Sequence, residues 1–189
     1  ILFVTAYACN VTKDTVVSRN FHAITTKYNV LFNGKEAFKK GIEEINNNYE
    51  DDWFKRLPIE PIVFEEDKIV LSSFNNNGPG AGFGENEDEE KKELTTFEKA
   101  EEKAVKAIQT HGMNINGIER NRQIDDAYLL LGKARYYTQR FIPAIEALNY
   151  VIANYPQADL IAETKIWRAK ANTRNDNEEI AIEAMKLLL

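Results

Sequence analysis

The sequence predicts an all-α protein, a solenoid of stacked helical hairpins with one flexible insertion. Three observations lead to this fold class. Apolar residues recur at the three-and-four spacing of helices through most of the chain. A pattern the size of one helical hairpin occurs twice in the last third, about 35 residues apart. Between these helical parts, residues 75–93 are too polar and too rich in Gly to form a core.

The composition excludes several classes of protein. A chain of 189 residues makes one domain or little more. The formal net charge of −6 argues against nucleic acid as a partner, because a nucleic-acid binder needs a basic surface. The single cysteine allows no intrachain disulfide, and with only His22 and His111 beside it the ligands for a Cys/His zinc site are too few. We therefore expect no metal, no cofactor and no small-molecule substrate.

The N-terminal residues predict an exported, lipid-anchored protein. Residues 1–8 are apolar and end in small residues, so we interpret them as a signal-peptide remnant. Cys9 follows directly and is the predicted site of lipidation. The alternative is a buried strand that carries an inert cysteine. Residues 9–19 would form the lipidated tether, in which Asp14-Thr15-Val16 resembles a short O-glycosylation acceptor with Thr15 as its hydroxyl. An unmodified tether explains the same three residues.

Residues 20–57 predict a first helical hairpin. Its first apolar stripe runs to Phe32, and Asn33-Gly34 is expected to end that helix. A second stripe extends from Ala37 to Ile45, after which three asparagines end it. Two short helices joined by a Gly turn would form an αα-hairpin.

Residues 58–95 predict an extended segment followed by a disordered insertion. Pro58 and Pro61 stop a helix, and the short β-branched runs after them favour extended chain. The glycines of residues 75–93 have neither the spacing of a dinucleotide-binding loop nor the ending of a phosphate loop. A linker is therefore the better interpretation.

Residues 96–189 predict one helix followed by two further hairpins. The helix is expected to begin at Thr96 as N-cap, with Lys99 where a capping box would need Glu, and to end before Gly112. After it, seven residues follow one repeat pattern: Tyr128, Leu131, Gly132, Ala144, Leu148, Val151 and Pro156. At these places the sequence resembles the tetratricopeptide repeat, from which Arg135 departs because the repeat has an aromatic residue there.

Small residues explain how the two helices of this repeat can pair. Gly132 and Ala144 allow a close approach, and Pro156 ends the second helix. A second copy follows, with Trp167 in place of Gly132. It reaches Leu189 without a polar capping segment, so we expect the array to continue beyond the chain end.

Three long stretches, residues 18–53, 97–113 and 123–156, resemble the N-terminal part of the SprE/PorW family of tetratricopeptide lipoproteins of Bacteroidetes. The resemblance implies a non-catalytic scaffold, anchored in the outer membrane through Cys9 and facing the periplasm. It also implies partners, namely the outer-membrane type IX translocon and the periplasmic ring and motor proteins. The expected role is to support protein secretion and gliding motility.

Two other classes of function compete with the scaffold. A SusD-like glycan-binding lipoprotein of a nutrient-uptake system would need aromatic residues grouped in loops, whereas Trp53 and Trp167 are expected to pack in or beside helices. An enzyme would need a catalytic set. The carboxylate pairs Glu65-Glu66 and Asp125-Asp126 are sequence neighbours, which favours a solvated face or a helix start.

The candidate partner-binding residues follow from the repeat phasing. In such arrays the first helix of each hairpin lines the face that receives a partner segment. The phasing places Lys133, Tyr136 and Tyr137 there, joined by Arg168 and Asn172 of the next hairpin. A cationic and aromatic groove on an acidic chain favours an acidic partner segment. A solvated helix face with ordinary packing of the tyrosines is the alternative.

Overall fold

The computed structural model describes residues 11–62 and 95–188. Their elements, in chain order, are α1 (Val16–Thr25), the π-helical turn η1 (Thr26–Leu31), α2 (Phe32–Asn48), α3 (Thr96–His111), β1 (Asn114–Ile115), β2 (Ile118–Glu119), α4 (Ile124–Tyr137), α5 (Phe141–Asn154), α6 (Ile161–Arg174) and α7 (Glu178–Lys186). The predicted all-α class is confirmed, since the strands form only a two-residue ladder.

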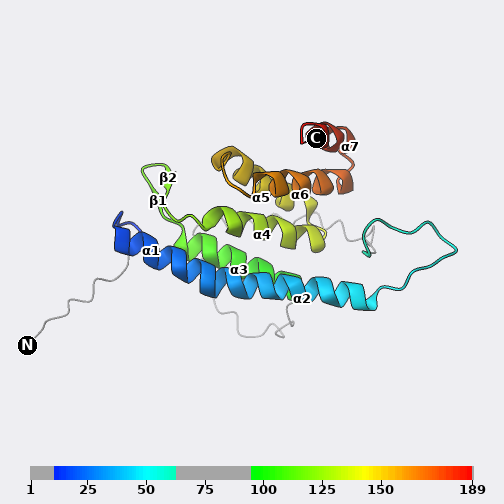
Figure 1. Ribbon diagram of the computed structural model, residues 1–189, viewed down its shortest axis with the longest axis horizontal. Helices are drawn as coiled ribbons and strands as arrows, with labels where there is room; N and C mark the ends of the chain where they lie inside the picture. The colour runs from blue at the N-terminus through cyan, green and yellow to red at the C-terminus, as the bar shows by residue number, and fades with distance from the viewer. Residues whose placement is uncertain (1–10, 63–94, 189) are drawn as a thin grey trace, which may run out of the picture.

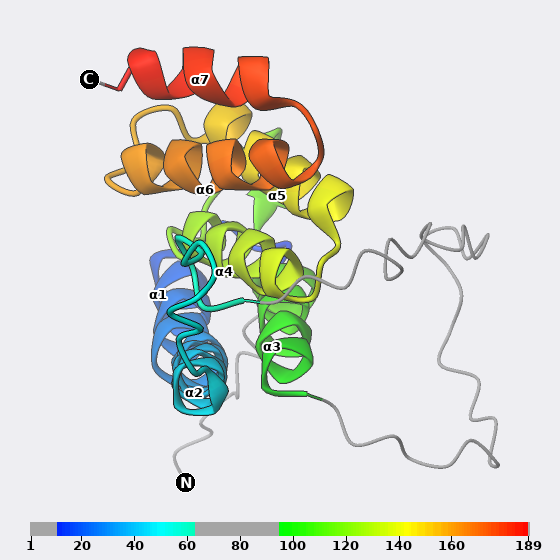
Figure 2. The same ribbon diagram turned by 90° about the vertical axis from the view of Figure 1, so that its right-hand side faces the viewer.

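The helices stack in the order of the sequence (Figure 1). Each helix from α2 to α7 packs on the next one along the chain, and α4 also contacts both α2 and α6. In the view turned by 90°, α2 and α3 lie at one end of the stack, which we call its base, and α7 lies at the opposite end (Figure 2). The core runs between the layers and includes Leu31, Ala104, Ala127 and Leu131.

The predicted turn at Asn33-Gly34 is wrong. Elements α1, η1 and α2 form one continuous helical rod from Val16 to Asn48, which pairs with α3 across the insertion. Gly34 allows α2 to pack closely against Leu130 of α4, because a Cβ at position 34 would lie 2.9 Å from Leu130 Cδ2. A helix-internal glycine is tolerated here since neighbouring helices occupy the space of its side chain. Residues 20–57 therefore do not form a hairpin of their own. Their helical part is the first arm of a longer hairpin, whose second arm is α3.

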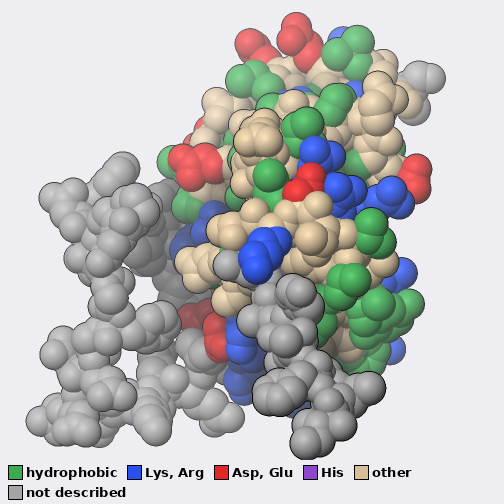
Figure 3. All heavy atoms as spheres, turned by 90° about the vertical axis from the view of Figure 1, so that its left-hand side faces the viewer, with side chains coloured by type: hydrophobic (Ala, Val, Ile, Leu, Met, Phe, Trp, Pro, Cys, Tyr) green, Lys and Arg blue, Asp and Glu red, His purple; other side chains and the backbone are tan. Residues whose placement is uncertain are grey.

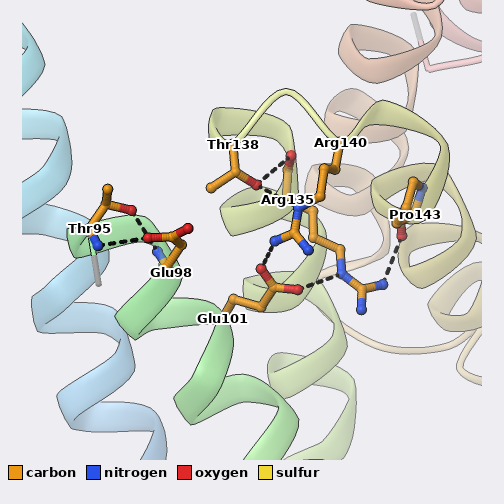
Figure 4. Close-up of polar contacts among 7 residues, drawn as sticks. All are labelled: Thr95, Glu98, Glu101, Arg135, Thr138, Arg140 and Pro143. Atoms are coloured by element: carbon orange, nitrogen blue, oxygen red, sulfur yellow. Dashed lines mark hydrogen bonds and ion pairs between the residues drawn. The ribbon is translucent and has the colours of Figure 1, made fainter. Parts of the chain in front are cut away.

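The boundaries of two predicted segments also change. The tether of residues 9–19 is shorter, because α1 begins at Val16 with Thr15 as its N-cap. For α3 the N-cap is Thr95 and not Thr96. The Thr95 hydroxyl accepts a bond from the Glu98 amide, and the Glu98 carboxylate accepts one from the Thr95 amide at 2.8 Å (Figure 4). This complete capping box fixes the start of α3 after the insertion.

Several predictions fall on residues that lie outside the described ranges. They are the signal-peptide remnant of residues 1–8, the lipidation site Cys9, the whole insertion of residues 75–93 and the extended segment from residue 63 up to it. The described part of the 58–95 segment ends at Ile62 and has no helix or strand.

The last four helices form two hairpins at the predicted places. Gly132 on α4 packs against Leu148 on α5, and a Cβ on Gly132 would lie 2.6 Å from Leu148 Cγ. Ala144 is fully buried. Helix α5 ends at Asn154, two residues before Pro156, as the sequence predicts. Small residues at this crossing therefore set the distance between α4 and α5.

Arg135, which departs from the repeat pattern, is held by an ion pair. Its Nε donates to Glu101 on α3 at 3.0 Å, and one guanidinium nitrogen donates to the Pro143 carbonyl at 3.1 Å (Figure 4). Glu101 also pairs with Arg140, in the turn between α4 and α5. The Glu101 side chain is only 12% exposed, so one nearly buried carboxylate joins α3 to the next hairpin.

Candidate functional site

An aromatic cluster links four helices on the side of the stack formed by α2, α4 and α6. Its members are Phe38, Phe97, Tyr136, Tyr137 and Trp167. The Tyr137 ring stacks on Phe97 with centroids 4.7 Å apart, and Tyr136 meets Trp167 edge to face at 5.5 Å. Burial raises the pKa of Tyr137 to about 12, and the Glu60 charge adds to that shift. Both tyrosines are therefore neutral at physiological pH.

Lys133 lies over this cluster and has partners on both sides. Its ammonium is 2.5 Å from the Glu163 carboxylate and lies 5.2 Å from the Trp167 ring centroid and 5.6 Å from that of Phe38. Burial raises the pKa of Glu163, but the bond and charge of Lys133 outweigh it, so that pKa is lowered. Lys133 thus connects α2, α4 and α6 through contacts within the chain.

The chain's own Glu60 occupies the cationic end of the same face. Tyr136, which is 1% exposed, donates its hydroxyl to Glu60 Oε2 at 2.7 Å. Lys170 forms an ion pair with Glu60 Oε1, and Arg174 Nη2 lies 3.7 Å from Oε2. We call Tyr136, Lys170 and Arg174 the carboxylate site. The Glu60 side chain is 16% exposed within it.

The electrostatics of the carboxylate site favour an anion. Burial alone would raise the pKa of Glu60, yet the bonds from Lys170 and Tyr136 and the charges of Lys170 and Arg174 lower it overall. The Lys170 ammonium also lies 4.1 Å from the Trp167 ring centroid, a cation–π contact that orients it. A carboxylate therefore meets two cations, one hydroxyl and an aromatic wall.

Glu60 reaches this site on a strap, which we define as residues 49–62. The strap leaves the end of α2, turns back and runs to the ends of α4 and α6 (Figures 1 and 2). The acidic segment predicted for this face is thus supplied, in this structure, by the chain itself. Pro58 and Pro61 flank the acidic residue and fix φ at these two positions, and the chain bends at residues 59–61.

The five predicted partner-binding residues divide into two groups. Lys133, Tyr136 and Tyr137 come together on the face just described. Arg168 instead donates to Asn149 of α5 at 3.2 Å, and Asn172 is 6% exposed and donates to the Arg168 carbonyl. Arg168 thus contacts α5 and not the side chains of Lys133, Tyr136 and Tyr137, and partner binding by Arg168 and Asn172 stays a prediction.

Sequence reasoning missed Lys170 and Arg174, which supply the cations of the carboxylate site. A signal was present, since Glu163, Trp167, Lys170 and Arg174 recur at the spacing of one helical face. Glu60 had no such signal, because its partners are 76 or more residues away in sequence.

A histidine pair joins α1 to the end of α3. His22 Nδ1 lies 3.0 Å from His111 Nδ1, so one ring must donate and the other accept. Burial, then the charges of His22 and Lys106, lower the pKa of His111. The neutral ring of His111 is therefore favoured, which weakens any charge–dipole interaction of this ring with the C-terminal end of α3.

The structure also describes the two tryptophans and the predicted glycosylation residue. Trp53 is not in a core; it is 78% exposed in the strap, next to the fully exposed Phe54. Trp167 is half-buried in the aromatic cluster, as expected. Thr15 is exposed, and its hydroxyl accepts a bond from the Ser18 amide at 3.2 Å as the N-cap of α1.

Comparisons of this chain with known proteins do not identify its family. No protein-family model matches the chain, and no curated protein resembles it at a significant level. Within the described ranges, no group of three or more His, Cys, Asp or Glu side chains could hold a metal ion. None of the helices in that part of the chain is long and apolar enough to cross a membrane.

Proposed function

We propose that this protein is a non-catalytic scaffold that binds partner proteins on the face carrying the aromatic cluster and the carboxylate site. The observation that carries the proposal is Glu60, whose carboxylate is held by Tyr136, Lys170 and Arg174. A partner segment with a carboxylate in a proline-flanked bend would satisfy the same groups after the strap leaves.

The finer fold assignment belongs to the same proposal. We assign the hairpins to the tetratricopeptide type. Helices α4, α5 and α6 are each 14 residues long, and Gly132 lies at the closest crossing of α4 and α5. The contacts of α4 with both α2 and α6 support one continuous face made by alternate helices.

The cellular role follows from the resemblance to the SprE/PorW family. The protein would be an outer-membrane lipoprotein facing the periplasm, linking the type IX translocon to the ring and motor components. The test is affinity purification from detergent-solubilised membranes of cells expressing tagged variants. We expect translocon and ring or motor proteins with the unaltered chain.

The variant that tests the face replaces Lys170 and Arg174 with Glu. Its control replaces Lys165 and Lys186 with Glu, which makes the same change of charge elsewhere on α6 and α7. Loss of partners in the first variant alone supports the proposal. Equal recovery of the secretion proteins with both variants would show that another surface binds them.

One observation favours the second candidate, a SusD-like glycan-binding lipoprotein. Trp53 and Phe54 are adjacent and exposed in the strap, the arrangement that sugar stacking needs. Titration of the chain with oligosaccharides, followed by Trp fluorescence, tests it. A saturable change that is lost in Trp53→Ala would favour this class, as would recovery of a nutrient transporter in the purification.

A further inference from the structure

The outer side of the first helical rod carries a continuous apolar stripe. Its members are Val17, Phe21, Ile24, Tyr28 and Phe32, each between 49% and 70% exposed. Their spacing of three and four residues puts them on one side of α1, η1 and the start of α2, opposite the residues buried against α3. Figure 3 shows hydrophobic side chains gathered at the base of the molecule, over this rod.

The stripe stops abruptly within the same rod. Beyond Phe32 the helix side that faces outward carries charged residues, and Lys39 pairs with Glu43 while Lys40 pairs with Glu44. The second half of the rod is therefore an ordinary solvated surface. The first half instead exposes a contiguous row of large apolar side chains, which single surface residues do not form.

The stretch that carries the stripe has basic but no acidic side chains of its own, and two of its three cations pair with carboxylates from outside it, Arg19 with Asp14 and Lys35 with Asp126. Residues 15–35 contain Arg19, Lys27 and Lys35 and no Asp or Glu, although the whole chain has a net charge of −6. Asp14, just before this stretch, lies between Arg19 at 2.5 Å and Arg120 at 3.3 Å and is thus neutralised. Lys27 lies beside the stripe, with its ammonium 5.4 Å from the Tyr28 ring centroid.

We infer that this stripe is an interfacial membrane-binding surface, which lies on anionic phospholipid with α1 and η1 parallel to the bilayer. An amphipathic helix with aromatic and aliphatic residues on one side and basic residues at its edges binds such an interface. Five exposed apolar side chains would enter the acyl boundary, while Lys27, which lies beside Tyr28 at the edge of the stripe, reaches the headgroups. The stripe, from residue 17 to residue 32, is about 24 Å long at 1.5 Å per residue.

Charge and shape favour lipid over a protein occupant. A second copy placed on the stripe would bring two stretches without acidic residues together, which is electrostatically unfavourable. The stripe is a protruding row of side chains on a single helix and not a groove between helices. A fluid acyl layer covers a convex apolar row without needing complementary pockets, whereas a protein partner does need them.

The test uses the full chain with Cys9→Ser, so that no acyl chain contributes to binding. The probes are vesicles of phosphatidylethanolamine and phosphatidylglycerol at 3:1, with phosphatidylcholine vesicles as comparison, measured by co-flotation. We expect at least tenfold stronger partitioning onto the anionic vesicles, weakening with added salt. Lys27→Gln should lower that partitioning about fivefold, the equivalent of about 1 kcal/mol per basic residue.

The decisive variant is Phe21→Gln with Ile24→Gln. Its matched control is Ile180→Gln with Ile182→Gln on α7, where the two side chains are 54% and 53% exposed. We expect at least a tenfold loss of partitioning for the first pair and less than twofold for the control, with unchanged far-UV circular dichroism in both. Equal flotation of the two variants would overturn the inference.

A protein occupant would give a different pattern. If the unaltered chain floats with neither vesicle but self-associates in analytical ultracentrifugation, and Phe21→Gln with Ile24→Gln abolishes that association, the stripe is a protein interface. This outcome also overturns the inference. Because Cys9 is absent from every sample, the result does not depend on the proposed lipid anchor.

Discussion

Replacing Glu60 with Gln tests whether the strap is held by charge. The amide keeps the shape of the side chain and can still accept the Tyr136 hydroxyl, but it loses the ion pairs with Lys170 and Arg174. The Lys170 side chain is 34% exposed and that of Glu60 is 16% exposed. The free energy lost should therefore lie between that of a surface ion pair and that of a buried hydrogen bond to a charged group. We expect Glu60→Gln to weaken docking of the strap by about 1–2 kcal/mol.

A loss of that size raises the fraction of molecules with an undocked strap about 5- to 30-fold. The assay is hydrogen exchange at the Ile62 amide, which donates to the Glu60 carbonyl at 2.7 Å. Its exchange should accelerate by the same factor, while amides of α5 stay unchanged. Glu50→Gln, an exposed position in the same strap, is the matched control and should leave Ile62 unaffected.

The same site predicts a pH dependence. Because the pKa of Glu60 is lowered in the folded state, its stabilising contribution is complete above the ordinary Glu value and is lost as pH falls through the lowered pKa. The protection factor of the Ile62 amide, which is its exchange rate relative to the intrinsic rate at the same pH, should therefore fall in acid for the unaltered chain and not for Glu60→Gln. Identical exchange in the two proteins at neutral pH and in acid would refute the argument that charge docks the strap.

Four other predictions test separate contacts. Gly132→Ala should destabilise the fold by about 1–3 kcal/mol in urea unfolding, because its Cβ would overlap Leu148, and the same change should cost less when it is made in a Leu148→Ala background. Glu101→Ala should cost about 1–3 kcal/mol, since Arg135 and Arg140 lose their shared carboxylate but can still reach water, whereas exposed Glu146→Ala should change stability by about 0.5 kcal/mol or less; similar midpoints for the two would contradict this prediction. The lowered pKa of His111 means that stability should fall as pH drops below the ordinary His value, and His111→Gln should flatten this part of the pH profile. Cys9→Ala should move the protein from the membrane to the soluble periplasmic fraction, and retention on membranes after deletion of its partners would place the anchor elsewhere.

Local features of the helices could be predicted from the sequence because they depend on neighbours three or four residues away. The predicted helices of residues 96–110 and those of the two C-terminal hairpins agree with α3 to α7 within a few residues. Gly132 and Ala144 could be assigned to a close helix crossing, since a missing side chain at that place has one simple explanation. Such predictions need no knowledge of the rest of the fold.

The predictions that failed rested on residues whose role depends on distant packing. Asn33-Gly34 resembles a helix end, yet Leu130 fills the space beside Gly34 and the helix continues. Trp53 resembles a core residue by its type, but no helix covers it. Arg168 shows the same dependence on packing, because its guanidinium contacts Asn149 of α5, a contact that the repeat phasing could not indicate.

The sequence by itself determined the helical class, the close crossing at Gly132 and the cationic and aromatic character of α4 and α6. Only the tertiary structure decided that Glu60 fills the carboxylate site and that His22 meets His111. The residues of the first contact are 76 positions apart and those of the second 89. Helical periodicity tells which residues share a face of one helix, but not which distant segment meets that face. That choice depends on the order of the stack and on how the strap folds back across it.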